Sequence, residues 1–400
     1  MPTPIDDYRA AAKQRFGILK GNFPLSANFW RLGYSFDTIV DYLTTSPADA
    51  TGFGQIALDR YTQSSGTWAP HPWYDDFGWW GIAGLKASQQ PDLFGDLTEQ
   101  FKAVALACWY GMDSKAPYVW DRADQQQFRA MQPRFEGGVW NSDWHDDETE
   151  DCSRRCNPLR PCDGLCGFQN TVTNGLYLVL AARLVLYLPR TPDYLSQAKR
   201  EYEFLKTWFR APQVDPLLKH IALDKAVVRE RVTAYCSGEK PWAYDEAMAW
   251  AGDQGLILGG LVDSMSIVKK PSSDYDEMRD TAMVILTGTT DYLVDKTSGL
   301  LQPWTPGMGP PGGDTWDYLT GIGVFMRYLL YAYQHNPELK AKLRSPDYQK
   351  FIRTNADHVL RGRVPGEDLG DEPLVDRVMI HATNDLATLL AGIVMLAPES

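Results

Sequence analysis

The stretch VTNGLYLVLAARLVLYL (Val172–Leu188) decides the fold class of this 400-residue chain. Its apolar residues recur at spacings of three and four, which is typical of an α-helix and not of a strand. The most apolar part, Gly175 to Leu188, is too short to cross a bilayer and contains Arg183. We therefore expect a buried helix and no membrane span.

Helical periodicity extends outward from this segment over most of the chain, whereas the strict alternation of strands is nearly absent. We predict helices over Ile5–Phe16, Phe29–Leu43, Trp79–Ala87, Leu97–Trp109, Val172–Leu188, Tyr194–Phe209, Ala247–Val262, Met278–Leu293, Leu319–Tyr333, Tyr348–Leu360 and Val378–Leu396, with a weaker helix in Ile56–Tyr61. About a dozen helices joined by alternately short and long connections suit six helical hairpins. The sequence thus predicts an all-α (α/α)6 barrel as a single domain over residues 1–400; an open solenoid would show a clearer internal repeat.

Charge and aromatic content limit the kinds of molecule that the protein is expected to bind. The formal net charge is −12 and no stretch clusters Lys and Arg, so nucleic acid is not an expected partner. Aromatic content is 12%, with 14 Trp and 20 Tyr, and this surplus either lines a carbohydrate cleft or fills a Trp-rich core. We expect a neutral oligo- or polysaccharide as the substrate, while the composition does not address the oligomeric state.

The cysteines and the N-terminus bear on the compartment. MPTPIDDYRAAAKQRF has no basic segment followed by an apolar one, so we expect no signal peptide in it. Cys152, Cys156, Cys162 and Cys166 crowd one loop at about residues 145–167, and we predict disulfides there, which imply an extracytoplasmic site. Zinc and free thiols stay open as alternatives, although zinc sites usually have tighter spacing. Cys108 and Cys236 are expected to be isolated buried thiols.

The segment HPWYDDFGWW (His71–Trp80) holds the strongest candidates for chemistry. It places two adjacent carboxylates, Asp75 and Asp76, among aromatic residues at the start of a predicted helix. Glycoside hydrolysis requires two carboxyl groups, and Cα atoms about 3.8 Å apart favour the closer spacing of retaining enzymes. Flanking rings would raise the pKa of one carboxyl, as a general acid requires. The competing interpretation is that these acids cap a helix and complement its dipole.

Other polar and aromatic residues are candidates for binding a sugar. They are Tyr74, Trp79, Trp80, Trp140, Asn141, Asn170, Asn174, Asp253, Gln254 and Asp317. Asn170 and Asn174 share a helical face, where they either bind hydroxyls or serve as caps. Asp253 and Gln254 interrupt an apolar helix, which indicates a polar cleft because unpaired polar groups are costly to bury. The acidic run HDDETE (His145–Glu150) is interpreted as a solvated loop rather than a magnesium site.

WYDDFGWWGIAGLKA (Trp73–Ala87) resembles the catalytic segment of glycoside hydrolase family 76, the endo-α-1,6-mannanases. Further segments resemble that family in the same order: Asn28–Leu43, Gly137–Asn141, Gln169–Leu184, Gly252–Asp263 and Asp317–Leu329. The resemblance implies an (α/α)6 barrel, retaining cleavage of α-1,6-mannan, and neither metal nor organic cofactor. It also implies that Asp75 is the nucleophile and Asp76 the general acid/base.

The sequence departs from the family where Asp253 replaces a usual Asn, and in the Cys-rich insertion, so the sugar and linkage stay open. A transglycosidase on the same scaffold and a non-catalytic glycan-binding protein are the alternatives. Binding alone would need neither a nucleophile nor an acid, which favours the enzyme. A sugar epimerase would want paired catalytic histidines, and this chain has 6 His with no convincing pair.

Overall fold

The computed structural model describes residues 4–67, 73–115, 138–139, 141, 170–188, 192–214, 226–230, 234–235, 243–244, 249–268, 270–306, 315–362 and 373–398. The four clustered cysteines, Cys236, the HDDETE run and Trp140 lie outside these ranges, so the predictions made for them stay predictions.

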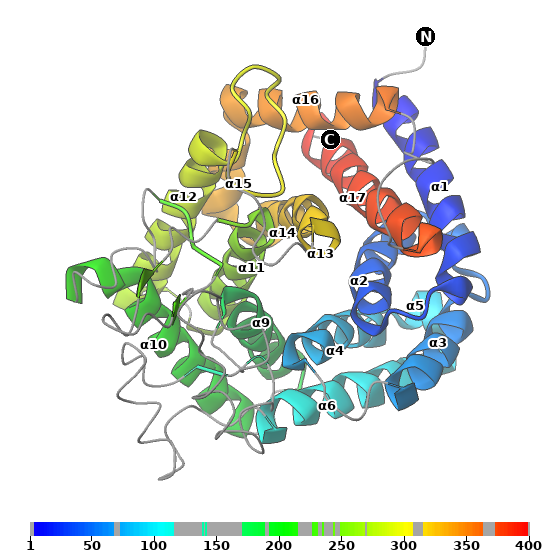
Figure 1. Cartoon of the computed structure of the whole chain (residues 1–400), viewed down its shortest axis with the longest axis horizontal. Coiled ribbons are helices and arrows are strands. Elements are labelled where there is room, and N and C mark those ends of the chain that lie inside the picture. The colour runs from blue at the N-terminus through cyan, green and yellow to red at the C-terminus, as the bar shows by residue number, and fades with distance from the viewer. Residues whose placement is uncertain are drawn as a thin grey trace.

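The described helices form an inner ring and an outer layer (Figure 1). The inner helices are α2 (Phe29–Thr45), α4 (Tyr74–Ser88), α9 (Thr171–Tyr187), α11 (Ala251–Val268), α14 (Gly321–His335) and α17 (Leu374–Met395). The outer helices are α1 (Pro4–Asn22), α3 (Phe53–Thr67), α6 (Thr98–Lys115), α10 (Pro192–Val214), α12 (Ser273–Tyr292) and α16 (Pro346–Arg361). Each inner helix packs against the next, and α17 returns to α2. The predicted barrel is confirmed, and every predicted segment overlaps one of these helices.

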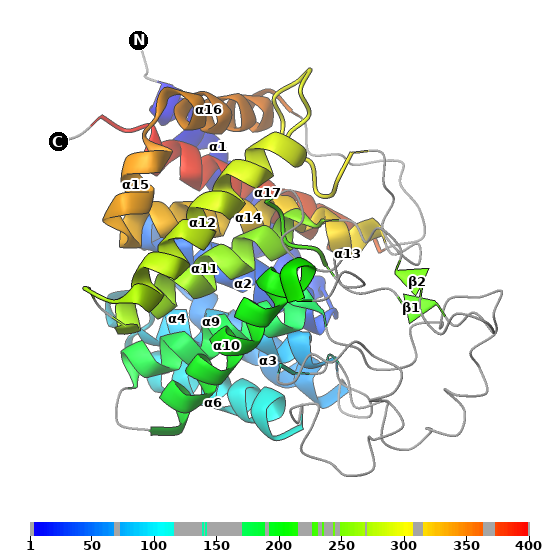
Figure 2. The same cartoon turned by 90° about the vertical axis from the view of Figure 1, so that its left-hand side faces the viewer.

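Shorter elements connect the barrel helices. They are the single turns η1 (Phe23–Leu25), η2 (Pro47–Ala50), η3 (Gly95–Leu97) and α5 (Pro91–Phe94), together with α13 (Thr315–Leu319), α15 (Pro337–Leu343), and strands β1 (Ala234–Tyr235) and β2 (Ala243–Tyr244). The strands pair antiparallel, with Ala234 opposite Tyr244. In Figure 2, α13, β1 and β2 lie on the same side of the barrel.

Glycines mark the points where the inner helices approach one another. At five glycines, an added Cβ would press against a neighbouring inner helix. The glycines and their nearest contacts are Gly33 with Trp80, Gly78 with Leu176, Gly175 with Leu256, Gly255 with Phe325, and Gly323 with both Tyr34 and Asn384. These glycines lie in the first two turns of their helices. Close approach requires a residue without a side chain at these crossings.

We expect Gly255→Ala to destabilise the protein by roughly 1–3 kcal/mol, because the added methyl overpacks the crossing of α11 and α14. Its Cβ would lie 2.8 Å from Phe325 Cα and 2.9 Å from the Val324 carbonyl, and backbone atoms cannot move aside as side chains do. Gly17 is the matched control, since a Cβ there meets nothing within 4 Å. Gly17→Ala should stabilise α1 by about 0.5–1 kcal/mol. Urea unfolding of both variants measures the difference, and equal effects would contradict the packing account.

Buried ion pairs fill the part of the barrel interior farther from these N-terminal turns. Arg183 Nε of α9 lies 3.0 Å from Asp263 Oδ2 of α11, and Arg327 Nε of α14 lies 3.0 Å from Asp37 Oδ2 of α2. Burial alone would raise the pKa of Asp37, but Arg327 and Lys86 outweigh it and hold that pKa below its usual range. Both arginines are therefore salt-bridged in the barrel interior.

Within the described residues, one helix, α17, is long and apolar enough to cross a membrane, with a mean hydropathy of 1.4. It is an inner helix of the barrel, and 78% of its apolar window is buried inside the protein. Its composition is therefore explained by packing in the core.

Candidate active site

The N-terminal ends of the inner helices meet at one end of the barrel, called the mouth below. Arg31 in the first turn of α2 contacts Asp317 of α13, and it lies 3.8 Å from Asp376 at the start of α17. Trp250, just before α11, donates its indole N–H to the Tyr318 carbonyl at 2.7 Å. Because helix N-termini carry partial positive charge, this end of the barrel favours carboxylates.

Asp75 and Asp76 lie in the first turn of α4, whose N-cap is Trp73. Neither acid is the N-cap residue, so capping does not account for the pair, whereas their place in the first turn fits the interpretation that they complement the helix dipole. The turn is fixed from outside, because Tyr74 N–H donates to the Asn141 carbonyl at 2.7 Å. Asn141 and Tyr74 are both buried and thus position the carboxylate pair.

Asp76 is buried, and among the described residues its Oδ2 has no hydrogen-bond partner. Burial raises the pKa of Asp76 well above its usual range, and the charges of Asp75 and Asp317 add to the rise while Arg31 opposes it. A carboxyl with a raised pKa holds its proton to higher pH than an ordinary aspartic acid, which is what a general acid needs. Asp75 is more exposed than Asp76, as a group that meets the substrate should be.

A charged cluster stands beside the pair. The Arg31 guanidinium lies 2.7 Å from Asp317 Oδ1, and Asp376 Oδ1 accepts a hydrogen bond from Ser26 Oγ at 2.5 Å. Arg31 is thus salt-bridged, and it is also one of the charges that act on Asp76. Asp317 is bound to Arg31, and its contact with substrate stays a prediction.

The tryptophans divide between the mouth and the core. Trp80 is fully buried between the layers and donates its indole N–H to the Phe29 carbonyl at 2.6 Å, so its prediction as a sugar-binding ring is wrong. Adjacent residues on a helix face different directions, and only one of the pair can face the barrel axis. Trp79 does so but is itself buried, with its ring centroid 6.0 Å from that of Trp30, and its contact with a sugar stays a prediction. Trp30 is half-buried and is the stacking candidate that the sequence did not reveal.

Side-chain amides near the mouth bind backbone. Asn174 Oδ1 accepts from Val139 N–H at 2.8 Å, and its Nδ2 donates to the Val139 carbonyl at 3.2 Å. Gln254 repeats the arrangement with Val228, at 2.8 and 2.6 Å. Asn170 is the N-cap of α9. Asn174 was predicted to contact sugar, and Gln254 was predicted to indicate a polar cleft. Instead, the side-chain amide of each residue binds the N–H and C=O groups of one buried residue, so neither amide is buried unpaired. Asp253 is fully buried in the first turn of α11, and its substrate contact stays a prediction.

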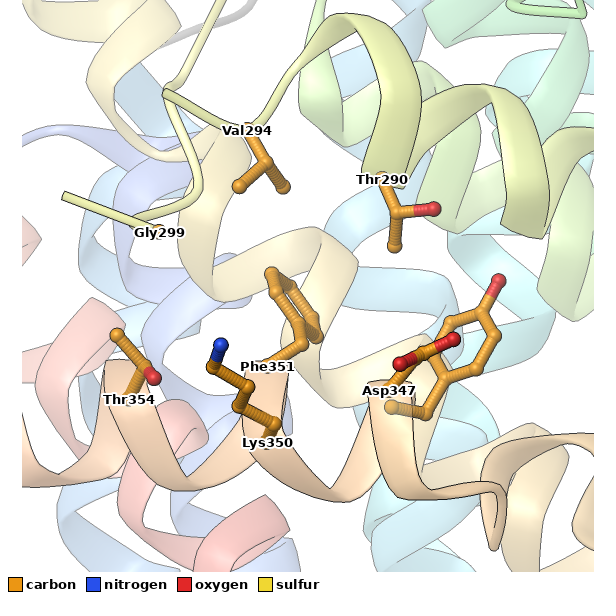
Figure 3. Close-up of a pocket in the computed structure, with 8 residues that line it drawn as sticks. Thr290, Val294, Gly299, Asp347, Lys350, Phe351 and Thr354 are labelled. Atoms are coloured by element: carbon orange, nitrogen blue, oxygen red, sulfur yellow. The ribbon is translucent and has the colours of Figure 1, made fainter. Parts of the chain in front are cut away.

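A separate pocket of about 240 Å³ lies on the outer side of the barrel between α12 and α16 (Figure 3). Phe351 and Lys350 of α16 and Thr290 of α12 line it. It is smaller than most ligand sites, which span roughly 300–1,000 Å³, and it contains none of the residues that face Asp76. The candidate active site is therefore assigned at the mouth, on chemistry rather than on volume.

The barrel fold of this chain is shared by proteins of solved structure. The chain is similar to a glycoside hydrolase family 76 α-mannanase of Bacteroides thetaiotaomicron, with a TM-score of 0.54 and 10% identity over 95% of both chains. It is also similar to a family 76 mannosidase of that species, with a TM-score of 0.52 and 12% identity over 91% of this chain and 88% of the other. A family 88 glycosyl hydrolase of Bacteroides vulgatus gives a TM-score of 0.52 and 9% identity over 98% of both chains.

No family model matches the sequence, and no curated protein sequence does. At 9–12% identity the structural similarity establishes the fold. The family 76 resemblance that the motifs indicated thus extends to the architecture.

Proposed function

We propose that the protein is a retaining glycoside hydrolase that cleaves an α-linked mannan or a related α-glycan. The observation that carries the proposal is the buried Asp76 carboxyl beside Asp75 at the mouth, with its pKa raised by burial and by neighbouring carboxylates. The glycan-active enzymes that share the fold support the substrate class.

In the first step, a carboxylate oxygen of Asp75 attacks the anomeric carbon. The bond to the leaving oxygen breaks, its electron pair stays on that oxygen, and Asp76 supplies the proton. In the second step, Asp76 takes a proton from water, the water oxygen attacks the anomeric carbon, and the ester bond to Asp75 breaks. If a second sugar replaces the water, the same steps give transglycosylation, which is the variant of this proposal.

A polysaccharide lyase also has this fold, so lyase chemistry is the rival function. Acting on an acidic sugar would require cations to neutralise the carboxylate of the substrate. In the described part of the mouth, the cation that acts on Asp76 is Arg31, and it is already paired with Asp317. This arrangement favours a neutral substrate and hydrolysis.

The first experiment is a product profile against a panel of α-linked mannans, glucans and arabinans. Proton NMR of the first-formed sugar gives the anomeric configuration before mutarotation. We expect cleavage of a mannan with retention of the α configuration. An unsaturated product, which absorbs in the ultraviolet, would establish the lyase instead, and inversion would remove Asp75 as a nucleophile.

We expect Trp30→Ala to weaken binding of a neutral oligosaccharide by roughly 1–3 kcal/mol, because the half-buried ring at the mouth offers a stacking face. Trp80→Phe is the matched control, since Trp80 lies wholly in the core. It should lower the melting temperature and leave the affinity for the oligosaccharide unchanged. Titration calorimetry on inactive protein, paired with thermal unfolding, separates the two effects, and unchanged affinity in Trp30→Ala would exclude Trp30 from the site.

A further inference from the structure

Arg31 is held in place by contacts on several sides. Its backbone N–H donates to Asn28 Oδ1 at 3.2 Å, which caps α2, and its side chain is 4% exposed. The guanidinium lies 2.7 Å from Asp317 Oδ1 and 3.8 Å from Asp376 Oδ2. A planar guanidinium fixed between two carboxylates has a defined orientation, unlike a flexible surface arginine.

Arg31 and the carboxylate pair lie in the first turns of two helices, α2 and α4, that pack against each other. The rings of Trp30 on α2 and Trp79 on α4 have centroids 6.0 Å apart, so the first turns of these helices lie side by side. Asp76 precedes Trp79 by three residues and shares its face of α4. Among the described residues, the charged groups that act on Asp76 are Asp75 on its own helix, Asp317 on α13 and Arg31 on α2.

Charge moves within the pair during the proposed reaction. Before the first step Asp75 is ionised and Asp76 is neutral; in the glycosyl-enzyme Asp75 is an uncharged ester and Asp76 is ionised. The total is unchanged, but the charge now lies at the more buried position, where desolvation disfavours it. A cation whose charge acts on Asp76, as that of Arg31 does, stabilises this second state selectively.

We propose that Arg31 is the positioning residue that stabilises ionised Asp76 in the glycosyl-enzyme, and that Asp317, by pairing with Arg31, keeps Asp76 protonated in the free enzyme. This inference rests on the proposed function for its chemical setting. It assigns Asp317 to the control of Asp76 through Arg31.

The test compares the pH dependence of kcat/KM in three variants. Asp317→Asn removes a negative charge and releases Arg31, so the alkaline limb should move to lower pH by about one unit, the size expected for one neighbouring charge. Arg31→Gln should move it to higher pH and make the glycosyl-enzyme accumulate on an activated substrate, seen by intact mass. Arg31→Lys retains the charge and should restore most of the wild-type profile.

Arg183→Gln is the matched control, because it breaks another buried pair, with Asp263, farther from the mouth. It should lower the melting temperature without moving the alkaline limb. If Arg31→Gln does not fold, Asp317→Asn still decides, since the Asp317 side chain is 36% exposed and tolerates the change.

Carbon-13 NMR of labelled aspartate, with Asp76 assigned by its loss in Asp76→Asn, follows the same titration without activity. Opposite displacements of the Asp76 titration in Asp317→Asn and Arg31→Gln support the inference. If the Asp76 titration does not move in these variants, the inference is wrong even if the enzyme hydrolyses glycans. If the titration moves but no glycan is hydrolysed, only the proposed function is wrong.

Discussion

Asp75→Asn should abolish turnover of every substrate, by at least about 10⁴-fold, because no glycosyl ester can form without the carboxylate. Asp76→Asn should behave differently. General acid catalysis contributes about 10²–10⁴-fold, so loss of the proton donor should cost that much for a natural glycosidic link. An activated aryl glycoside, whose leaving group needs little protonation, should be cleaved at close to the wild-type rate in the first step.

The measurement is the rate of each variant over a series of aryl leaving groups of falling pKa. The rate of Asp76→Asn should depend steeply on the leaving group, while Asp75→Asn stays inactive throughout. Equal residual activity of both variants across the series would remove the assignment of different roles.

Asp76→Asn should also stabilise the fold at neutral pH. The pKa of Asp76 is raised by burial, so the folded protein retains a proton that the unfolded chain releases. Wild-type stability from this group is present below the unfolded pKa and is lost as pH rises toward the folded pKa, by about 1.4 kcal/mol per pH unit. Asn cannot ionise, so the stability of Asp76→Asn should not fall with pH for this reason. The difference between the two proteins is the stability lost by keeping a buried acid.

Urea unfolding of both proteins between pH 3 and 9 tests this expectation. The two should be equally pH-dependent near the unfolded pKa of about 3.9 and diverge above it in favour of Asp76→Asn. Asp295 is the control of opposite sign, because hydrogen bonds from Ser298 lower its pKa. Asp295→Asn should lose stability, and its deficit should shrink as pH falls. Parallel curves for wild type and Asp76→Asn would contradict the raised pKa.

Periodicity alone predicted the helices, since every predicted segment overlaps a barrel helix. The closure of the helices into a ring was harder to predict from the sequence. It depends on glycines such as Gly78, Gly175 and Gly255, which are unremarkable singly and share a role only through their positions at helix crossings. Each is the fifth residue of its helix, and an apolar pattern does not detect this shared position.

The candidate site was predicted in part. Adjacency and aromatic neighbours placed Asp75 and Asp76 at the start of α4, which the structure confirms. The effect of Asp317 and Arg31 on Asp76 depends on residues distant in sequence and could not be inferred from either segment alone. Asn174 and Gln254 were misleading because an amide that binds a sugar hydroxyl and an amide that binds a peptide unit have the same sequence pattern.

Trapping of the glycosyl-enzyme tests the central claim most directly. Asp76→Asn protein should react with an activated aryl α-mannoside oligosaccharide, release the aryl group in a burst, and then stall because no base activates water. Intact mass spectrometry should show one glycosyl group per chain, and fragmentation should place it on Asp75. Turnover without any adduct, or an adduct on a residue other than Asp75, would contradict the retaining mechanism proposed for this barrel.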